Sequence, residues 1–357
     1  MKFFEDYFKS YSNLLDISML GDDYLKFIDL CNEVKNRNGK IVFLGNGASA
    51  SISSQAATDF SQHAHIRSHA FNDHNLITAF GNDYGYENWM TEALKVYADS
   101  DDLFILISSS GESKNILNAA SYLKANNYNF FSFTGMNPEN NLKKLSDNFL
   151  WIDSNSYNHI ENAHMFLILM AANLIENSKV SLAEIKNNAD FLIDYLNKEV
   201  DHELLVDMRS LCDEVKNTNS KLIFIGNGGF SSIASHAATD FSKQSRIKSI
   251  CFNDHNLLTT YANDFGQNNW AKEALKVYAK ETDVLFLMSV SGNSRNLVSA
   301  GEFFLTNNKK IITFTGTCKD NSLSKIGYVN FSTTRNEPFM VQSIASTQIF
   351  SVVDYFG

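Results

Sequence analysis

The chain has 357 residues, of which 44% are hydrophobic, 13% aromatic and 20% charged, a composition typical of a folded globular protein rather than a disordered or fibrous one. Its formal net charge of −10 gives no general attraction to nucleic acid or to anionic membranes, so we expect neither as a partner. The four cysteines lie far apart with no CxxC pair, which indicates neither a disulfide framework nor a structural zinc site. Because the acidic N-terminal residues also lack the pattern of a signal peptide, we expect a cytoplasmic protein.

The second half of the sequence repeats the first at a constant offset of 181 residues. The tripeptide at 45–47 recurs at 226–228, and the heptapeptide at 92–98 recurs at 273–279. A period of this length is a whole domain rather than a solenoid repeat. We therefore predict two domains, residues 1–180 and 181–357, each large enough to bury its own core and joined by a helix around 181–200.

Short apolar runs alternate with helical stretches along the first repeat. The predicted strands are 40–44, 102–107, 129–133 and 149–152, and the predicted helices are 51–62, 115–125 and 158–176. Strands that alternate with helices predict an α/β domain with a parallel sheet covered by helices on both faces. In such sheets the ligand binds at the carboxyl ends of the strands.

Loops rich in Gly and Ser follow the strands that end near residues 44 and 107, and Thr134 and Gly135 follow the next one. A loop of this kind before a helix offers backbone N–H groups, hydroxyl donors and the positive end of the helix dipole, all of which bind anions such as phosphate. A dinucleotide fingerprint is incomplete because Ala50 replaces its third glycine, and no Gly-Lys-Ser/Thr of a Walker loop is present. The simpler interpretation is a set of turns and helix caps, but the recurrence of two Ser-rich loops in both repeats favours a ligand site.

The ordered motifs GNGAS at 45–49, GNDYG at 81–85 and ISSSGES at 107–113 resemble those of the sugar isomerase (SIS) domain, within it most closely the phosphoheptose isomerase branch. The corresponding motifs of the second repeat are GNGGF at 226–230, ANDFG at 262–266 and MSVSGNS at 288–294. The resemblance implies two tandem SIS domains, each a five-stranded parallel sheet flanked by helices in a flavodoxin-like three-layer sandwich. It also implies a phosphorylated sugar as ligand and a homodimer that brings four SIS domains together.

The substrate-binding residues implied by the resemblance lie in these loops and at the start of the following helices. They are Asn46, Gly47, Ser49, Gln55, Asn82, Asp83, Ser108, Ser109, Ser110 and Ser113 in the first repeat, and Asn227, Ser289, Ser291 and Ser294 in the second. Two replacements, Ser49 by Phe230 and Ser109 by Val290, remove hydroxyls from the second repeat. We therefore expect the first repeat to bind phosphate better, with the Phe230 ring standing where an anion would approach.

An aldose–ketose isomerase needs a base and an acid to move protons between two carbons and two oxygens. The resembled isomerases carry a His and a Glu four residues apart on the helix after the first loop, and a Gln and a His on the last helix. The matching positions are Gln55, Asp59, Glu161 and Leu169 in the first repeat, and His236, Asp240, Gln342 and Phe350 in the second. Neither repeat keeps the Glu of the first pair, and neither keeps the His of the last helix.

We predict that Asp59 or Asp240 is the base and that Glu161, His164 or His236 supplies the acid, although His164 is equally consistent with a packed histidine. No cofactor is required, and zinc is a candidate only at His236 with Asp240. The predicted function is an aldose–ketose isomerase acting on a heptose phosphate of the sedoheptulose 7-phosphate type through an enediol. The alternative, favoured by the lost Glu and His, is a catalytically inactive SIS protein that binds a phosphosugar as a regulator or scaffold.

A final pattern is the hexapeptide FNDHNL at 71–76, which recurs unchanged at 252–257. An Asp before an apolar run supplies an Asx turn and a helix cap, so we predict that Asp73 and Asp254 begin helices. The aromatic pairs 130–131 and 303–304 are predicted to lie in the core.

Overall fold

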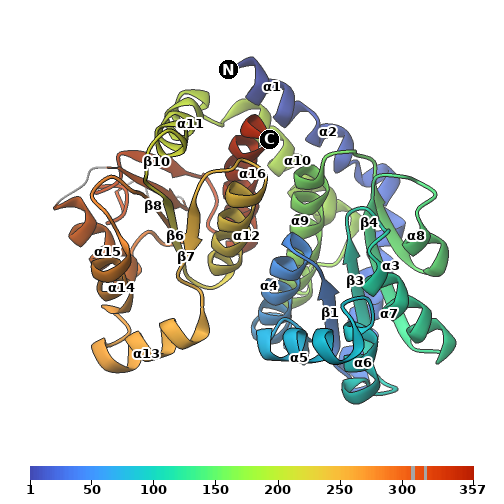
Figure 1. Ribbon diagram of the computed structural model, residues 1–357. Helices are drawn as coiled ribbons and strands as arrows, with labels where there is room; N and C mark the ends of the chain where they lie inside the picture. The colour runs from blue at the N-terminus through green and yellow to red at the C-terminus, as the bar shows by residue number, and fades with distance from the viewer. Residues whose placement is uncertain (307–309, 317–319) are drawn as a thin grey trace. The chain divides into compact units, whose positions relative to one another are not determined.

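The computed structural model describes residues 1–306, 310–316 and 320–357, and these form two compact units (Figure 1). The first-repeat unit comprises Phe8–Tyr195, and the second-repeat unit comprises Met1–Tyr7 with Leu196–Gly357. This division differs from a boundary at 180/181 at both ends of the first repeat. The N-terminal residues group with the second-repeat unit, where the Phe3 ring meets the Tyr355 ring edge-on at 5.4 Å. Most of the joining helix groups with the first-repeat unit.

The first-repeat unit holds one parallel sheet with the strand order β2-β1-β3-β4-β5. After α1 (Lys2–Lys9), which spans the division, its elements are α2 (Tyr11–Leu14), α3 (Ile17–Asn36), β1 (Ile41–Gly45), α4 (Ala48–Gln62), β2 (Ser68–Ala70), α5 (His74–Tyr84), α6 (Trp89–Tyr97), β3 (Leu103–Ser108), α7 (Lys114–Ala125), β4 (Asn129–Gly135), α8 (Asn141–Leu145), β5 (Phe149–Ile152), α9 (Tyr157–Glu176) and α10 (Leu182–Lys198). The predicted strands and helices are all present, and the join between the repeats is helical as predicted.

The second-repeat unit has the same architecture, with a parallel sheet in the order β10-β9-β8-β6-β7. Read from the other edge, this order matches that of the first sheet strand for strand. The elements are α11 (His202–Lys216), β6 (Leu222–Gly226), α12 (Gly229–Lys243), β7 (Ser249–Cys251), α13 (His255–Phe265), α14 (Trp270–Tyr278), β8 (Val284–Ser289), α15 (Arg295–Leu305), β9 (Ile311–Thr315), β10 (Val329–Ser332) and α16 (Pro338–Phe356). The predicted α/β class and the two five-stranded parallel sheets are confirmed.

Each sheet is buried on both faces at its centre. Every residue of β1 and β3 is buried, whereas the edge strand β2 is partly exposed. Alternate side chains of β1 point to opposite faces: Val42 and Leu44 join the core cluster that contains Trp89, while the Phe43 ring packs 5.4 Å from Phe60 of α4. The helices on both faces hold the strands so that the loops at their carboxyl ends have fixed positions.

Local signals in the sequence act as predicted at several helix ends. Asp73 accepts hydrogen bonds from the backbone N–H groups of Asn75 and Leu76 at the start of α5, and Asp254 accepts one from Leu257 at the start of α13. The predicted cap function of both aspartates is confirmed. Among the described residues, no helix is both long and apolar enough to cross a membrane.

Candidate functional site

The turn after β1 is tied to the start of α7 by two asparagines. Asn46 Nδ2 donates to Asn115 Oδ1 at 2.9 Å, and Asn115 Nδ2 donates back to Asn46 Oδ1 at 2.8 Å. The Tyr86 hydroxyl donates to the same Asn46 Oδ1 at 3.0 Å. The loops after β1 and β3 therefore lie together at one edge of the sheet, as neighbouring parallel strands require.

The Ser-rich loop leads from the end of β3 into the N-terminal turn of α7. Ser113 is the N-cap residue of α7, yet its side chain makes no cap hydrogen bond and instead lies 3.4 Å from the Ser108 hydroxyl. The Ser110 hydroxyl accepts the Glu112 N–H at 3.2 Å. Helix geometry leaves the first N–H groups of α7 without backbone partners inside the helix, and one of them, that of Ile116, donates to the Asn115 side chain at 3.0 Å. The loop thus gathers hydroxyl donors at a positive helix end, which is an arrangement that binds phosphate.

Gly111 allows this loop to close against α8. Its φ of +66° lies in the left-handed region, and a Cβ at this position would come within 2.0 Å of Asn140 Oδ1. The Glu112 carboxylate turns to α8, where it accepts from the N–H of Asn141 at 2.9 Å and from its side-chain Nδ2 at 2.7 Å. The negative charge of Glu112 is therefore committed to the start of α8.

The second repeat keeps this framework with fewer donors. Its reciprocal amide pair is Asn227 with Asn296, at 3.0 and 2.9 Å. Ser289 lies 2.9 Å from the Ser294 hydroxyl and 3.4 Å from the Ser291 hydroxyl, so the three retained hydroxyls bond to one another. Because Val290 stands at the position of Ser109, this loop has fewer hydroxyl groups that can donate to an anion than the first loop has.

The structure corrects the expectation that the Phe230 ring stands where an anion would approach the second repeat. Phe230 has no exposed surface and Ser49 is 3% exposed. The aromatic ring therefore does not stand in the open mouth of the second loop, and the Ser49 hydroxyl is not on the open surface of the first. A Cβ at Gly45 would come within 2.5 Å of the Ser49 backbone, so the turn between β1 and α4 is tight and the start of α4 packs directly on the end of β1.

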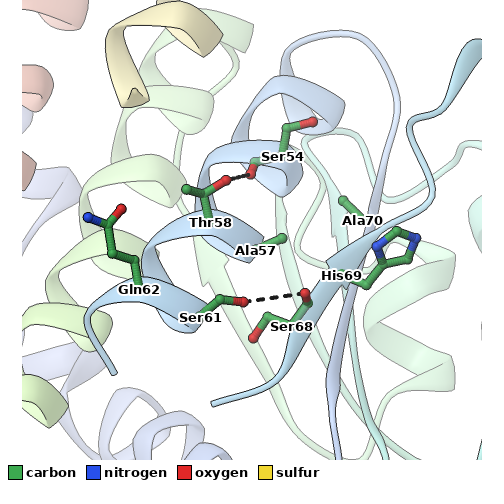
Figure 2. A pocket seen from close by; sticks show the side chains of 8 residues that line it. All are labelled: Ser54, Ala57, Thr58, Ser61, Gln62, Ser68, His69 and Ala70. Carbon is green, nitrogen blue, oxygen red and sulfur yellow. Dashed lines mark hydrogen bonds between the residues drawn. The ribbon is translucent and has the colours of Figure 1, made fainter. Parts of the chain in front are cut away.

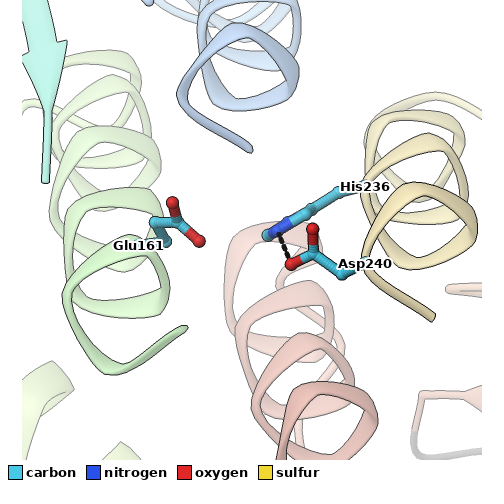
Figure 3. Close-up of side chains that lie close together, drawn as sticks. All are labelled: Glu161, His236 and Asp240. Carbon is cyan, nitrogen blue, oxygen red and sulfur yellow. Dashed lines mark hydrogen bonds and ion pairs between the residues drawn. The ribbon is translucent and has the colours of Figure 1, made fainter. Parts of the chain in front are cut away.

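Glu161, on the first turns of α9, is the predicted acid that reaches the Ser-rich loop. The Ser109 hydroxyl lies 3.4 Å from Glu161 Oε1, and the Glu161 side chain is mostly buried. Figure 3 shows its carboxylate projecting from α9. Asn82 and Asp83 lie on the last turn of α5, both exposed, with Asn82 Nδ2 donating to Asp83 Oδ1 at 3.0 Å.

The predicted base Asp59 lies on α4, one helical turn after the buried Gln55. Burial raises the pKa of Asp59 from 3.8 to about 6, with an opposing contribution from His63 and a further increase from Glu176. A carboxylate whose pKa approaches neutrality is suited to general base chemistry near pH 7.

His164 occupies a different environment from the other predicted acids. Its side chain has no exposed surface, its ring packs against Phe133, and its Nε2 lies 3.1 Å from the Thr134 carbonyl oxygen. Burial lowers its pKa to about 4, so it is neutral at pH 7. This is the arrangement of a packed histidine, and we leave His164 out of the proposal below.

His236 and Asp240 form a hydrogen-bonded pair on α12 of the second-repeat unit (Figure 3). His236 Nε2 and Asp240 Oδ2 are 3.0 Å apart, and both side chains are mostly buried. The His236 ring also packs on Phe350 of α16, with ring centroids 3.9 Å apart. His and Asp side chains are among the ligands that zinc sites in proteins use.

A separate hollow of about 580 Å³ lies beside the edge strand of the first sheet (Figure 2). It runs between α4 and β2, and half of its lining residues carry a small hydroxyl side chain: Ser54, Ala57, Thr58, Ser61, Gln62, Ser68, His69 and Ala70. It contains none of the predicted site residues, and it lies beside the sheet rather than at the carboxyl ends of its central strands. We do not assign the candidate site to it.

Three residues that support the site were missed in the sequence: Asn115, Asn140 and Tyr86. Asn115 and Asn140 recur in the second repeat as Asn296 and Asn321, so retention of a polar residue in both repeats was a signal that could have identified them. Tyr86 is replaced by Gln267, and the pattern of the repeats gives no signal for it.

Comparison with known proteins places these features in a family. A family model for the SIS domain matches residues 87–174. The phosphoheptose isomerase of Burkholderia pseudomallei is 32% identical over 177 residues, which cover 45% of this chain and 87% of that protein. That of Helicobacter pylori is 30% identical over 155 residues, covering 42% of this chain and 80% of that protein.

Two solved structures match almost the whole chain. They are the C-terminal domain of glucosamine-fructose-6-phosphate aminotransferase from Francisella tularensis, with a TM-score of 0.63 at 13% identity, and the tagatose-6-phosphate ketose/aldose isomerase from Escherichia coli, with a TM-score of 0.62 at 14% identity. Each match covers 99% of this chain and 92% of the chain in the solved structure. At these identities the two structures establish the fold alone. The family model and the 32% identity to a phosphoheptose isomerase show that the chain belongs to the SIS-domain family, and its two repeats fold as two SIS domains in tandem.

Proposed function

We propose that the chain is a phosphosugar aldose–ketose isomerase that binds its substrate in the first repeat, and that the substrate is a heptose phosphate of the sedoheptulose 7-phosphate type. The observation that carries the proposal is the Ser-rich loop at the N-terminus of α7, with Glu161 Oε1 3.4 Å from the Ser109 hydroxyl. One loop thus presents phosphate donors beside a carboxyl group. The 32% identity to a phosphoheptose isomerase supports the choice of a heptose.

The proposed chemistry divides the roles among three groups. The hydroxyls of Ser108–Ser113 and the N–H groups of α7 hold the phosphate, which anchors the end of the sugar far from the carbonyl and so orients the chain that carries the reacting carbons. Asp59, ionised above its pKa of about 6, removes the proton from the carbon beside the carbonyl and returns it to the neighbouring carbon. Glu161 exchanges protons with the two oxygens of the enediol. His236 and Asp240 are the corresponding candidates in the second repeat.

The alternative function is a SIS protein that binds a phosphosugar without turning it over. One observation favours it: an Asp takes the Glu position in both repeats, which shortens the reach of the carboxylate, and a misplacement of about 1 Å can cost about a hundredfold in rate. A regulator would keep the phosphate loop and lose only the chemistry.

The deciding experiment follows isomerisation of sedoheptulose 7-phosphate by NMR, beside hexose and pentose phosphates and with and without added zinc. We expect conversion that Asp59→Asn abolishes. Thermal stabilisation by one of these phosphates without turnover would support the binding protein and overturn the isomerase.

A matched pair of variants tests where the phosphate binds. The Ser110 hydroxyl accepts the Glu112 N–H at 3.2 Å, and the Ser291 hydroxyl accepts the Asn293 N–H at the same distance. Ser110→Ala and Ser291→Ala therefore remove the same backbone hydrogen bond, and Ser291→Ala also removes the 3.4 Å contact with the Ser289 hydroxyl. We expect Ser110→Ala to weaken binding of the sugar phosphate roughly tenfold, the usual effect of one lost hydrogen bond to a charged group. Equal losses from both variants would contradict a site in the first repeat.

A further inference from the structure

The carboxyl ends of α4 and α9 meet around a histidine that the proposed reaction does not use. His63 directly follows α4, and its Nδ1 lies 3.2 Å from Oε1 of Glu176, the last residue of α9. The two side chains are 33% and 38% exposed, so both meet solvent. Two helix carboxyl ends and a carboxylate are groups that stabilise a cation, and a histidine side chain becomes one when it binds a proton.

Asp59 lies one helical turn before this pair. The His63 N–H bonds to the Asp59 carbonyl at 2.8 Å, so the two side chains, four residues apart, share one face of α4. From α3, Lys35 Nζ donates to the Ala64 carbonyl at 2.7 Å and is thus held at the end of the helix. The charges of His63 and Glu176 act on Asp59 in opposite directions, since His63 lowers its pKa and Glu176 raises it.

The arrangement exists in the first repeat alone. The hexapeptide at 56–61, which contains Asp59, recurs unchanged at 237–242, but Gln244 stands at the His63 position and Gly357 at the Glu176 position. In the second repeat Asp240 pairs instead with His236 on its own helix. Because the hexapeptide is unchanged while the His–Glu pair stands in one repeat only, the pair is expected to serve what the first repeat does.

We propose that His63 and Glu176 form a charge pair that sets the protonation state of Asp59, which makes His63 a positioning residue for the carboxylate assigned as the base. The inference rests on the proposed function for its purpose, but the coupling among the three groups is a property of the protein without substrate. In the intact pair the two charges oppose each other at Asp59. Loss of either partner leaves the other charge uncompensated, so the two losses have opposite effects.

The test titrates the Asp59 carboxyl group by ¹³C NMR in the full chain, with its signal assigned by its disappearance in Asp59→Asn. We expect His63→Gln to move the midpoint upward by roughly half a pH unit, as for a unit charge one helical turn away near the surface, and Glu176→Gln to move it downward. His63→Gln copies the residue found at position 244, and both side chains are partly exposed, so both variants should fold. Gln244→His is the matched control and should leave the midpoint unchanged.

Shifts in the same direction, or no shift in either variant, would overturn the inference whatever the protein catalyses. If the protein turns over a heptose phosphate, the acid limb of its kcat/KM profile should move with the NMR midpoint in each variant. Opposite NMR shifts without turnover of any phosphosugar would instead keep the inference and overturn the proposed isomerase.

Discussion

Replacement of Gly111 by Ala tests whether the Ser-rich loop depends on its close approach to α8. The residue has φ +66°, and the added Cβ would come within 2.0 Å of Asn140 Oδ1. Asn140 is fully buried and cannot easily move away. Its Nδ2 donates to the Asn137 carbonyl at 2.8 Å and to the Gly135 carbonyl at 3.2 Å, and its Oδ1 accepts the Lys143 N–H at 2.9 Å.

Two contributions give the expected magnitude. An Ala in the left-handed region costs about 1–2 kcal/mol. Displacing Asn140 breaks three hydrogen bonds, each with a net value of about 1 kcal/mol. We therefore expect Gly111→Ala to lower the free energy of unfolding of the first-repeat unit by about 4–5 kcal/mol, unless the loop opens, in which case phosphate binding is lost.

The assay is urea unfolding combined with thermal stabilisation by the sugar phosphate. Gly292→Ala is the matched control, because Gly292 has φ +64° and its Cβ would come within 2.2 Å of Asn321 Cγ. We expect the control to destabilise its own unit similarly while the first repeat keeps its ligand. A Gly111→Ala protein within about 1 kcal/mol of the parent, with binding intact, would refute the reasoning.

Three further predictions concern stability. Burial raises the pKa of Asp59 in the folded protein from 3.8 to about 6, so the free energy of unfolding falls as the pH rises through this interval and the buried carboxyl group ionises. Asp59→Asn should therefore raise the free energy of unfolding by up to about 3 kcal/mol at pH 7 and by almost nothing at pH 4. Urea unfolding at both pH values measures the difference. Gly81 lies inside α5, nothing lies within 4 Å of a Cβ added there, and the matching residue of the second repeat is Ala262. Gly81→Ala should therefore raise the free energy of unfolding by about 0.5–1 kcal/mol, and a lower melting temperature would contradict this. Asp102 is 1% exposed and accepts hydrogen bonds from Lys40 Nζ at 2.5 Å and from two backbone N–H groups. Asp102→Ala should therefore lower the free energy of unfolding by about 3–5 kcal/mol. The control is Asp101→Ala at the exposed neighbouring position, which should lower it by at most about 0.5 kcal/mol.

The sequence alone determined the elements of each repeat and the ends of several helices. Apolar runs such as 40–44 and 102–107 are long enough to define buried strands, and their alternation with helices leaves few topologies besides a parallel sheet. Asp73 caps α5 through hydrogen bonds to residues two and three positions later, so its action is contained in its own segment. The repeat at 181 residues then extended each inference to the second half.

Contacts between distant segments were decided only by the tertiary structure. The Asn46–Asn115 pair joins residues 69 positions apart, and the His63–Glu176 pair joins residues 113 positions apart. Local propensity carries no information about which of many polar side chains will meet across such separations, because the packing of whole helices on the sheet sets their distance. For the same reason the burial of Phe230 and His164 could not be read from residue type, since each side chain faces inward or outward according to the register of its helix on the core.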